Sequence, residues 1–137
     1  MNIDVPALSI ITVVKDDFDG IHETYHSIKD LLNHELIEWV IVDGSNDEIT
    51  EEYFSKKKSN ILYHRSFDGG IYPAMQTALT FCKSEYVWFL NARDLNLLNF
   101  NQLSKALQLK EFPEIIKFNA RVPQKGYLKD KERLGFL

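Results

Sequence analysis

Five consecutive apolar residues, Tyr86 to Leu90, constrain the fold of this chain more than any other feature. Three are aromatic and one is β-branched, and the run is too short for a free-standing helix, so it is typical of a strand buried on both faces. It ends abruptly in Asn91-Ala92-Arg93-Asp94. A buried parallel strand brings its carboxyl end to the rim of an open sheet, where ligands bind. We therefore expect Asp94 at such a rim; alternatively, Asn91 and Asp94 only turn the chain and cap the next helix.

Similar apolar runs alternate with helical patterns along the rest of the chain. Residues 8–14, 38–42, 61–63 and 114–118 are predicted as strands, and 21–33, 46–58, 71–83 and 102–109 as helices. This alternation predicts a three-layer α/β/α domain with a mostly parallel, Rossmann-like sheet over residues 1–120. Residues 121–137 are predicted to be a polar, loosely held C-terminal tail.

Two local patterns add detail to these helices. Ser45 and Glu48 have the spacing of a capping box at the start of the second helix. The third helix has apolar residues that share one face: Ile71, Met75, Ala78, Leu79 and Cys82.

Composition excludes several classes of partner. A net charge of −4 with one short lysine cluster gives no support for nucleic acid or an anionic membrane as the main partner. The single cysteine, Cys82, has no internal disulfide partner, which fits a reducing compartment. No apolar run approaches the roughly 20 residues of a transmembrane helix, and the amino terminus lacks the regions of a signal peptide. We expect a cytoplasmic protein, with peripheral membrane attachment left open.

Residues able to do chemistry gather where the predicted strands end. Three clusters qualify, at 12–17, 43–47 and 91–94, and Asp68-Gly69-Gly70 precedes a helix whose free amides could meet an anion. Carboxylates beside such a helix suggest a nucleotide held through a divalent cation such as Mg²⁺ or Mn²⁺. Neither the dinucleotide fingerprint nor the P-loop motif is present, which weakens the dehydrogenase and kinase interpretations.

Four stretches in this order resemble the amino-terminal half of a family 2 glycosyltransferase of the GT-A type. The resemblance covers about residues 8 to 119, and Pro113-Glu114-Ile115-Ile116 resembles the strand that follows. The stretches are Leu8–Val14, Val42-Asp43-Gly44-Ser45-Asn46-Asp47 with Thr50, Asp68-Gly69-Gly70-Ile71-Tyr72-Pro73-Ala74-Met75, and Glu85–Asp94.

The resemblance implies transfer of a sugar from a nucleotide-diphosphate donor, typically UDP-linked, to an acceptor hydroxyl. The usual setting of such enzymes is cell-surface polysaccharide assembly. By the same resemblance, Asp43 would accept a hydrogen bond from the base and Asp94 would bind the metal, Mn²⁺ or Mg²⁺. The nucleotide-binding residues would be Thr12, Val14, Asp43, Asp68, Gly70 and Asn91.

The chain also departs from the family pattern. Arg93 replaces an expected carboxylate, so it either offers its charge to the diphosphate or repels a cation, and Pro73 and Gln76 also differ. The part that supplies the acceptor site and general base has no counterpart, and nothing places the late acids Glu114, Asp130 and Glu132. The competing hypotheses are an active transferase, in which a homo-oligomer or partner chain supplies the missing half, and a degenerate nucleotide-binding or structural remnant.

A more remote alternative comes from His22-Glu23-Thr24-Tyr25-His26, which matches the zincin pattern H-E-x-x-H. Two histidines four apart share one side of a helix and the glutamate could act as a base. Lys29 and Asn33 continue their row, which indicates polar surface instead. A third ligand would have to be His34 or His64, and neither has a recognisable spacing.

Overall fold

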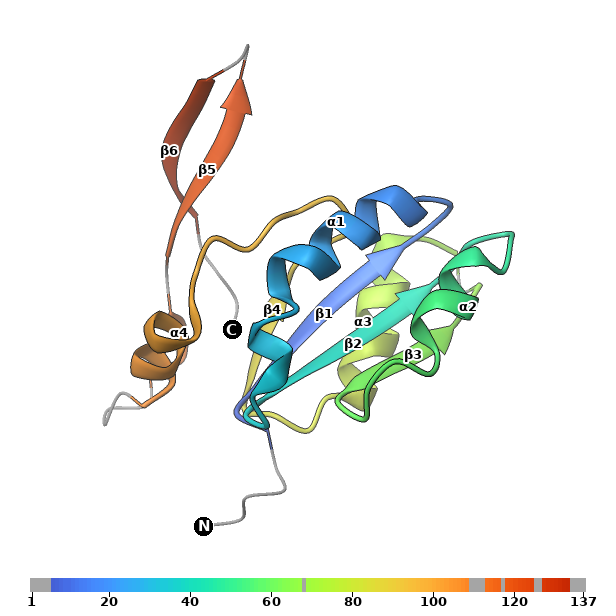
Figure 1. Ribbon diagram of the computed structural model, residues 1–137, viewed down its shortest axis with the longest axis horizontal. Helices are drawn as coiled ribbons and strands as arrows, with labels where there is room; N and C mark the ends of the chain where they lie inside the picture. The colour runs from blue at the N-terminus through green and yellow to red at the C-terminus, as the bar shows by residue number, and fades with distance from the viewer. Residues whose placement is uncertain (1–5, 68, 109–112, 117, 125–126, 134–137) are drawn as a thin grey trace.

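Four parallel strands form the central sheet of the computed structural model, which describes residues 6–67, 69–108, 113–116, 118–124 and 127–133 (Figure 1). They are β1 (Leu8–Val14), β2 (Ile37–Asp43), β3 (Ile61–Arg65) and β4 (Tyr86–Phe89), in the order β3-β2-β1-β4. Val14 lies opposite Asp43, so β1 and β2 end level with each other. The prediction of a parallel α/β fold is confirmed.

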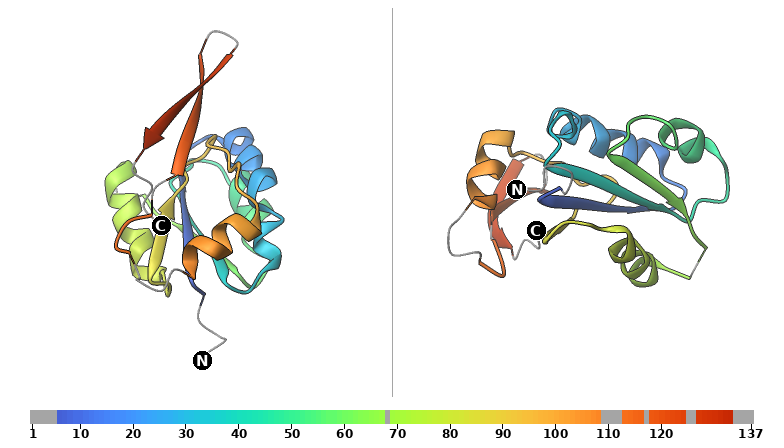
Figure 2. Two further views of the ribbon diagram at one scale, coloured as in Figure 1. Left: turned by 90° about the vertical axis from the view of Figure 1, so that its left-hand side faces the viewer. Right: turned by 90° about the horizontal axis from the view of Figure 1, so that it is seen from below.

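Helices cover both faces of this sheet. α1 (Phe18–Ile28) and α2 (Ile49–Phe54) lie on one face, and α3 (Ile71–Phe81) lies on the other (Figure 2). The helix predicted for 21–33 ends at Ile28, and a 3₁₀ turn, η1 (Leu31–Asn33), follows it. α4 (Phe100–Leu107) begins at a capping box made by Asn99 and Gln102. None of the described helices is long and apolar enough to cross a bilayer.

The two central strands carry the core. Every residue of β1 and β2 is buried, as expected for parallel strands covered on both faces. Under α1 and α2 the core is large and aromatic, with Trp39 stacked on Tyr25 and edge-on to Phe54. Under α3 it is smaller, because α3 is the only helix on that face in the described part of the chain; its buried members are Ile11, Val13, Val40, Val42 and Ala78.

One prediction of burial on both faces is wrong, and the apolar face of one helix is less buried than its spacing suggests. β4 is an edge strand, so Val87, Trp88 and Phe89 are half-buried instead of enclosed on both faces. In α3 only Ala78 is buried, while Ile71 and Leu79 are 47% and 44% exposed. Met75 and Cys82 are half-buried against the core under α3, so the apolar face of the helix contacts the sheet without being enclosed by it.

The predicted fifth strand, 114–118, is not part of the sheet. Residues 113–116 form no strand; Ile116 is buried in the core cluster and Ile115 is exposed, while residue 117 lies outside the described part. β5 (Phe118–Gln124) pairs antiparallel with β6 (Tyr127–Arg133) in a separate hairpin, which Figure 1 shows standing away from the main sheet. Part of the predicted polar tail is therefore a strand. The apolar pattern of 114–118 marks a core contact, which periodicity over so few residues does not separate from a strand.

Candidate functional site

A cavity of about 520 Å³ opens where β1 and β2 end. Its floor and walls come from the end of β1, the loop after β2, and the segment that joins β3 to α3. This is the position in which open α/β sheets bind ligands, and the volume suits a small-molecule ligand. The residues that line it are Val13, Val14, Lys15, Gly44, Asn46, Ser66, Phe67, Gly69, Gly70, Ile71 and Ala74.

The amino terminus of α3 opens onto this cavity. Gly69 and Gly70 have φ values of +82° and +129°, which glycine adopts without steric cost. The helix has no side-chain cap at Gly70, so its first amides stay available for an anion. Predicted site residues Val14 and Gly70 thus lie on one cavity, whereas Asp68 lies outside the described residues.

Lys15 brings positive charge to the cavity. It is exposed, and it is the only charged residue among the described residues that line the cavity. The sequence placed Lys15 at the end of a strand but assigned it no role. Its position beside the free amides of α3 suits the binding of a phosphate group.

Asp43 is placed differently from the prediction, because its carboxylate is fully buried and already hydrogen-bonded. The Ser45 amide donates to Oδ1 at 2.8 Å, and the Tyr63 hydroxyl donates to Oδ2. Burial, followed by the hydrogen bond to Asp43, raises the pKa of Tyr63, which keeps its hydroxyl protonated as a donor. In this structure Asp43 supports the loop after β2 and does not line the cavity.

Thr12 is also buried and lies outside the cavity lining. Its hydroxyl accepts a hydrogen bond from Trp39 Nε1 at 2.8 Å and donates to the Leu90 carbonyl at 2.6 Å. It therefore joins β1 and β2 to the residue that follows β4. In this structure the Thr12 hydroxyl is engaged by Trp39 and Leu90 and does not face the cavity.

The loops after β1 and β2 are tied together at the cavity rim. The Asn46 amide and side-chain Nδ2 donate to the two carboxylate oxygens of Asp16, at 2.8 and 2.9 Å. The Asp16 amide donates to Ser45 Oγ at 2.8 Å, so Ser45 does not cap α2 and the predicted capping box is wrong. Asp16 has a φ of +52°, an uncommon conformation outside glycine. These bonds fix Asn46 on the cavity wall.

The segment after β4 runs beside the tip of β1 and forms a second polar rim. The Leu90 and Ala92 amides donate to the Ile11 and Val13 carbonyls, which brings Asn91 and Asp94 next to β1. Neither of these two predicted residues lines the cavity.

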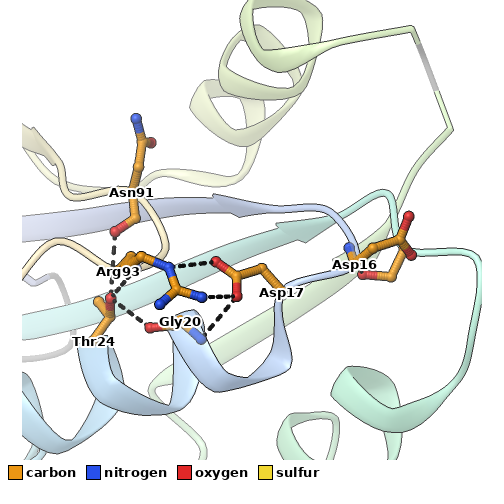
Figure 3. A network of polar contacts seen from close by, with 7 residues as sticks. Asp16, Asp17, Gly20, Thr24, Asn91 and Arg93 are labelled. Atoms are coloured by element: carbon orange, nitrogen blue, oxygen red, sulfur yellow. Dashed lines mark hydrogen bonds and ion pairs between the residues drawn. The ribbon is translucent and has the colours of Figure 1, made fainter.

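Arg93 faces α1 (Figure 3). Its guanidinium donates to both carboxylate oxygens of Asp17, at 2.6 and 3.2 Å. The Arg93 amide donates to the Gly20 carbonyl and the Thr24 hydroxyl, which together hold it at a φ of +82°. The hydrogen bonds from the Arg93 guanidinium hold the pKa of Asp17 below its usual range.

The donor set near Asp94 fits a divalent cation only in part. Asp94 is exposed and its Oδ2 accepts the Asn91 amide at 3.2 Å, which leaves Oδ1 for a ligand. Asn91 Oδ1 is buried without a partner. No three metal-binding side chains cluster within the described ranges. One carboxylate is enough for Mg²⁺ or Mn²⁺ where substrate phosphates supply most other ligands.

The H-E-x-x-H residues, His22 to His26, belong to α1, and His22 faces Tyr53 of α2. His22 Nε2 is 3.2 Å from the Tyr53 hydroxyl, and its ring packs edge-on against His26. No third ligand joins these histidines among the residues that the structure describes. The pair therefore belongs to an aromatic contact between two helices.

Comparison with known proteins agrees with this fold. Residues 9–111 match the model of the family described as Glycosyl transferase family 2. Two relatives from strains of Mycobacterium tuberculosis, both described as uncharacterized glycosyltransferases, are 30% identical over 90 residues. That match covers 65% of this chain and 34% of each relative, so the chain spans about a third of their length.

Solved structures show the same fold. A crystal structure of S. aureus TarS superposes with a TM-score of 0.56 at 22% identity, over 73% of this chain and 19% of that one. A second TarS structure, of residues 1–349, gives a TM-score of 0.54 at 24% identity, over 73% and 31%.

Proposed function

Because this chain belongs to glycosyl transferase family 2, we propose that its cavity binds the nucleotide-diphosphate sugar from which a sugar is transferred to an acceptor hydroxyl. The observation that carries the proposal is the shared opening of the β1 and β2 ends and the uncapped α3 terminus onto one cavity. A UDP-linked donor is the first candidate, since it is the donor that the family resemblance implies.

The diphosphate is proposed to lie against the first amides of α3 and Lys15. Helix amino termini favour negative charge, and a lysine adds a point charge that needs no exact geometry. Both groups would stabilise charge that develops on the departing diphosphate, which is the electrostatic part of catalysis. Gly69 and Gly70 leave open space where a side chain would otherwise stand, with no atom within 4 Å of an added Cβ.

A divalent cation is proposed to accompany the diphosphate. When bound, it would neutralise charge on the leaving group. Asp94 is the proposed protein ligand, and the ion pair with Asp17 holds the Arg93 guanidinium on the α1 side. This arrangement favours the interpretation that Arg93 orders the segment after β4 over direct repulsion of the cation.

The acceptor hydroxyl needs a general base, and no carboxylate or histidine is among the described residues that line the cavity. We therefore propose that the base and acceptor site come from chain beyond this donor-binding unit or from a partner chain. Surface-polysaccharide assembly is the proposed setting. The alternative function is nucleotide binding without transfer, which shares the same cavity.

Calorimetric titration with UDP, with and without Mn²⁺, tests donor binding. We expect Lys15→Met to weaken UDP about ten- to a hundredfold, the range for a lost hydrogen bond to a charged group. Lys29→Met is the matched control, because Lys29 is an exposed lysine at the end of α1, outside the cavity. Asp94→Asn should remove any Mn²⁺ dependence.

Absence of UDP binding to the unaltered chain would contradict the donor proposal. Equal affinity for UDP with and without Mn²⁺ would contradict only the proposed binding of a cation. Binding without turnover of UDP-sugars, even with an acceptor preparation, would favour the nucleotide-binding alternative.

A further inference from the structure

Phe67 is an exposed aromatic residue inside a concave site. Its exposed fraction is 67%, and it lines the cavity two positions before Gly69 in the sequence. Single exposed apolar side chains are ordinary on protein surfaces. Phe67 differs from them because its ring has a fixed cationic partner and shares a cavity with free backbone amides.

That partner is Arg65, the last residue of β3. Its Nη2 donates to the carbonyls of Ser45 and Asp47 at 2.9 and 2.7 Å, and its Nη1 is 3.4 Å from Glu51 Oε1. The guanidinium is therefore anchored on the loop after β2, and it lies 5.4 Å from the centre of the Phe67 ring. A cation at this distance attracts an aromatic ring. The contact orders the ring before a ligand arrives, which lowers the entropic cost of binding.

Because the Asp43 carboxylate is already hydrogen-bonded, binding of a base would depend more on contact with the face of the base than on its edge. The two Asp43 carboxylate oxygens already accept bonds from Ser45 and Tyr63, so this buried group is not free to read a base edge. What the cavity offers a flat heterocycle is one aromatic ring together with aliphatic surface from Val13, Val14 and Ile71.

We propose that Phe67 is the stacking platform for the nucleobase of the donor, held in position by Arg65. This inference rests on the proposed function, because it assigns the base end of the same nucleotide site. Base–aromatic stacking uses the face of the base and does not require a hydrogen-bonded edge. Phe67 thereby takes the role in base recognition that the sequence assigned to Asp43.

The test compares UDP with inorganic pyrophosphate, which lacks a base, by calorimetric titration of the full chain. We expect Phe67→Ala to weaken UDP by about five- to a hundredfold, the range for alanine substitution of base-stacking aromatics. Pyrophosphate affinity should not change, and Phe67→Trp should retain UDP binding. Tyr72→Ala is the matched control, because Tyr72 is 79% exposed and is not a lining residue of the cavity.

Several outcomes would overturn the inference, and they are distinct from failure of the donor site. Unchanged UDP affinity in Phe67→Ala, or equal losses for UDP and pyrophosphate, would show that Phe67 does not stack on a base. Equal affinity of the unaltered chain for UDP and pyrophosphate would also show that Phe67 does not stack on a base. The proposed diphosphate site would not be affected by that result. If the unaltered chain binds neither ligand, the proposed function fails and the inference fails with it.

Discussion

Thr12 shows how a single hydroxyl on β1 can connect β2 with the segment after β4. It accepts from Trp39 on β2 and donates to Leu90 after β4, and it is completely buried. A buried donor without a partner costs more than an ordinary hydrogen bond contributes, because it loses water and gains nothing. Thr12 is therefore a structural residue beneath the site.

We predict that Thr12→Val lowers the free energy of unfolding by about 1–3 kcal/mol, since it leaves Trp39 Nε1 unpaired in the core. Thr12→Ser keeps the hydroxyl and should restore most of the loss. Chemical denaturation monitored by tryptophan fluorescence measures both variants. Equal stability of Thr12→Val and the unaltered chain would contradict this role.

The misplaced role of Thr12 has a simple geometrical origin. Successive side chains of a strand point to opposite faces, so the side chains of Thr12 and Val13 point away from each other. Val13 lies in the cluster under α3 and lines the cavity, whereas Thr12 lies with Trp39 on the other face. A strand buried on both faces has no polar alternation from which the sequence could reveal its orientation.

At the scale of elements, one ion pair ties the segment after β4 to the start of α1. Asp17 caps the helix by accepting the Gly20 amide at 3.1 Å, and the same carboxylate holds Arg93. A Cβ on Gly20 would stand 2.1 Å from Asp17 Oδ2, so only glycine leaves room for this arrangement. The cap and the ion pair share one side chain.

Asp17→Asn separates these two roles, because asparagine still caps a helix but carries no charge. The pKa of Asp17 lies below its ordinary 3.8 in the folded chain, owing first to the hydrogen bond from Arg93. Its contribution to stability is therefore complete above about pH 3.8 and is lost as the pH falls through the lower folded-state pKa.

We expect Asp17→Asn to be less stable than the unaltered chain at neutral pH, and the two stability curves to converge in acid. Thermal unfolding across pH 2 to 7 measures this. Asp30→Asn is the control, since Asp30 is exposed and makes no side-chain cap bond. A difference between the curves that persists unchanged at the lowest pH would contradict the ion-pair explanation.

The two central strands were predicted well, whereas the ends of the first two helices were not. β1 and β2 appear close to where their apolar runs indicated, because continuous burial leaves a clear pattern. Ser45 fits a capping-box spacing, yet its hydroxyl bonds to Asp16 across the site. A tertiary contact of this kind outcompetes a local one, and residue spacing gives no sign of it.

At the scale of the whole molecule, sheet order decides which residues meet. The order β3-β2-β1-β4 places β1 between β2 and β4, so the three polar strand ends adjoin as the sequence predicted. The cavity nevertheless forms on the α3 side, from backbone, Lys15 and Phe67, and it excludes most of the predicted carboxylates. The position of the site could be predicted from the fold class, whereas its lining depends on side-chain direction and loop contacts.

The most direct test of a nucleotide site at this sheet edge is amide chemical-shift mapping by NMR during titration of the 16.0 kDa chain with UDP. We predict that the perturbed amides cluster at Lys15, Asn46, Gly69 and Ile71, with little change at His22 between α1 and α2. Saturable shifts centred on α1 and α2, or no saturable shifts at all, would contradict the account.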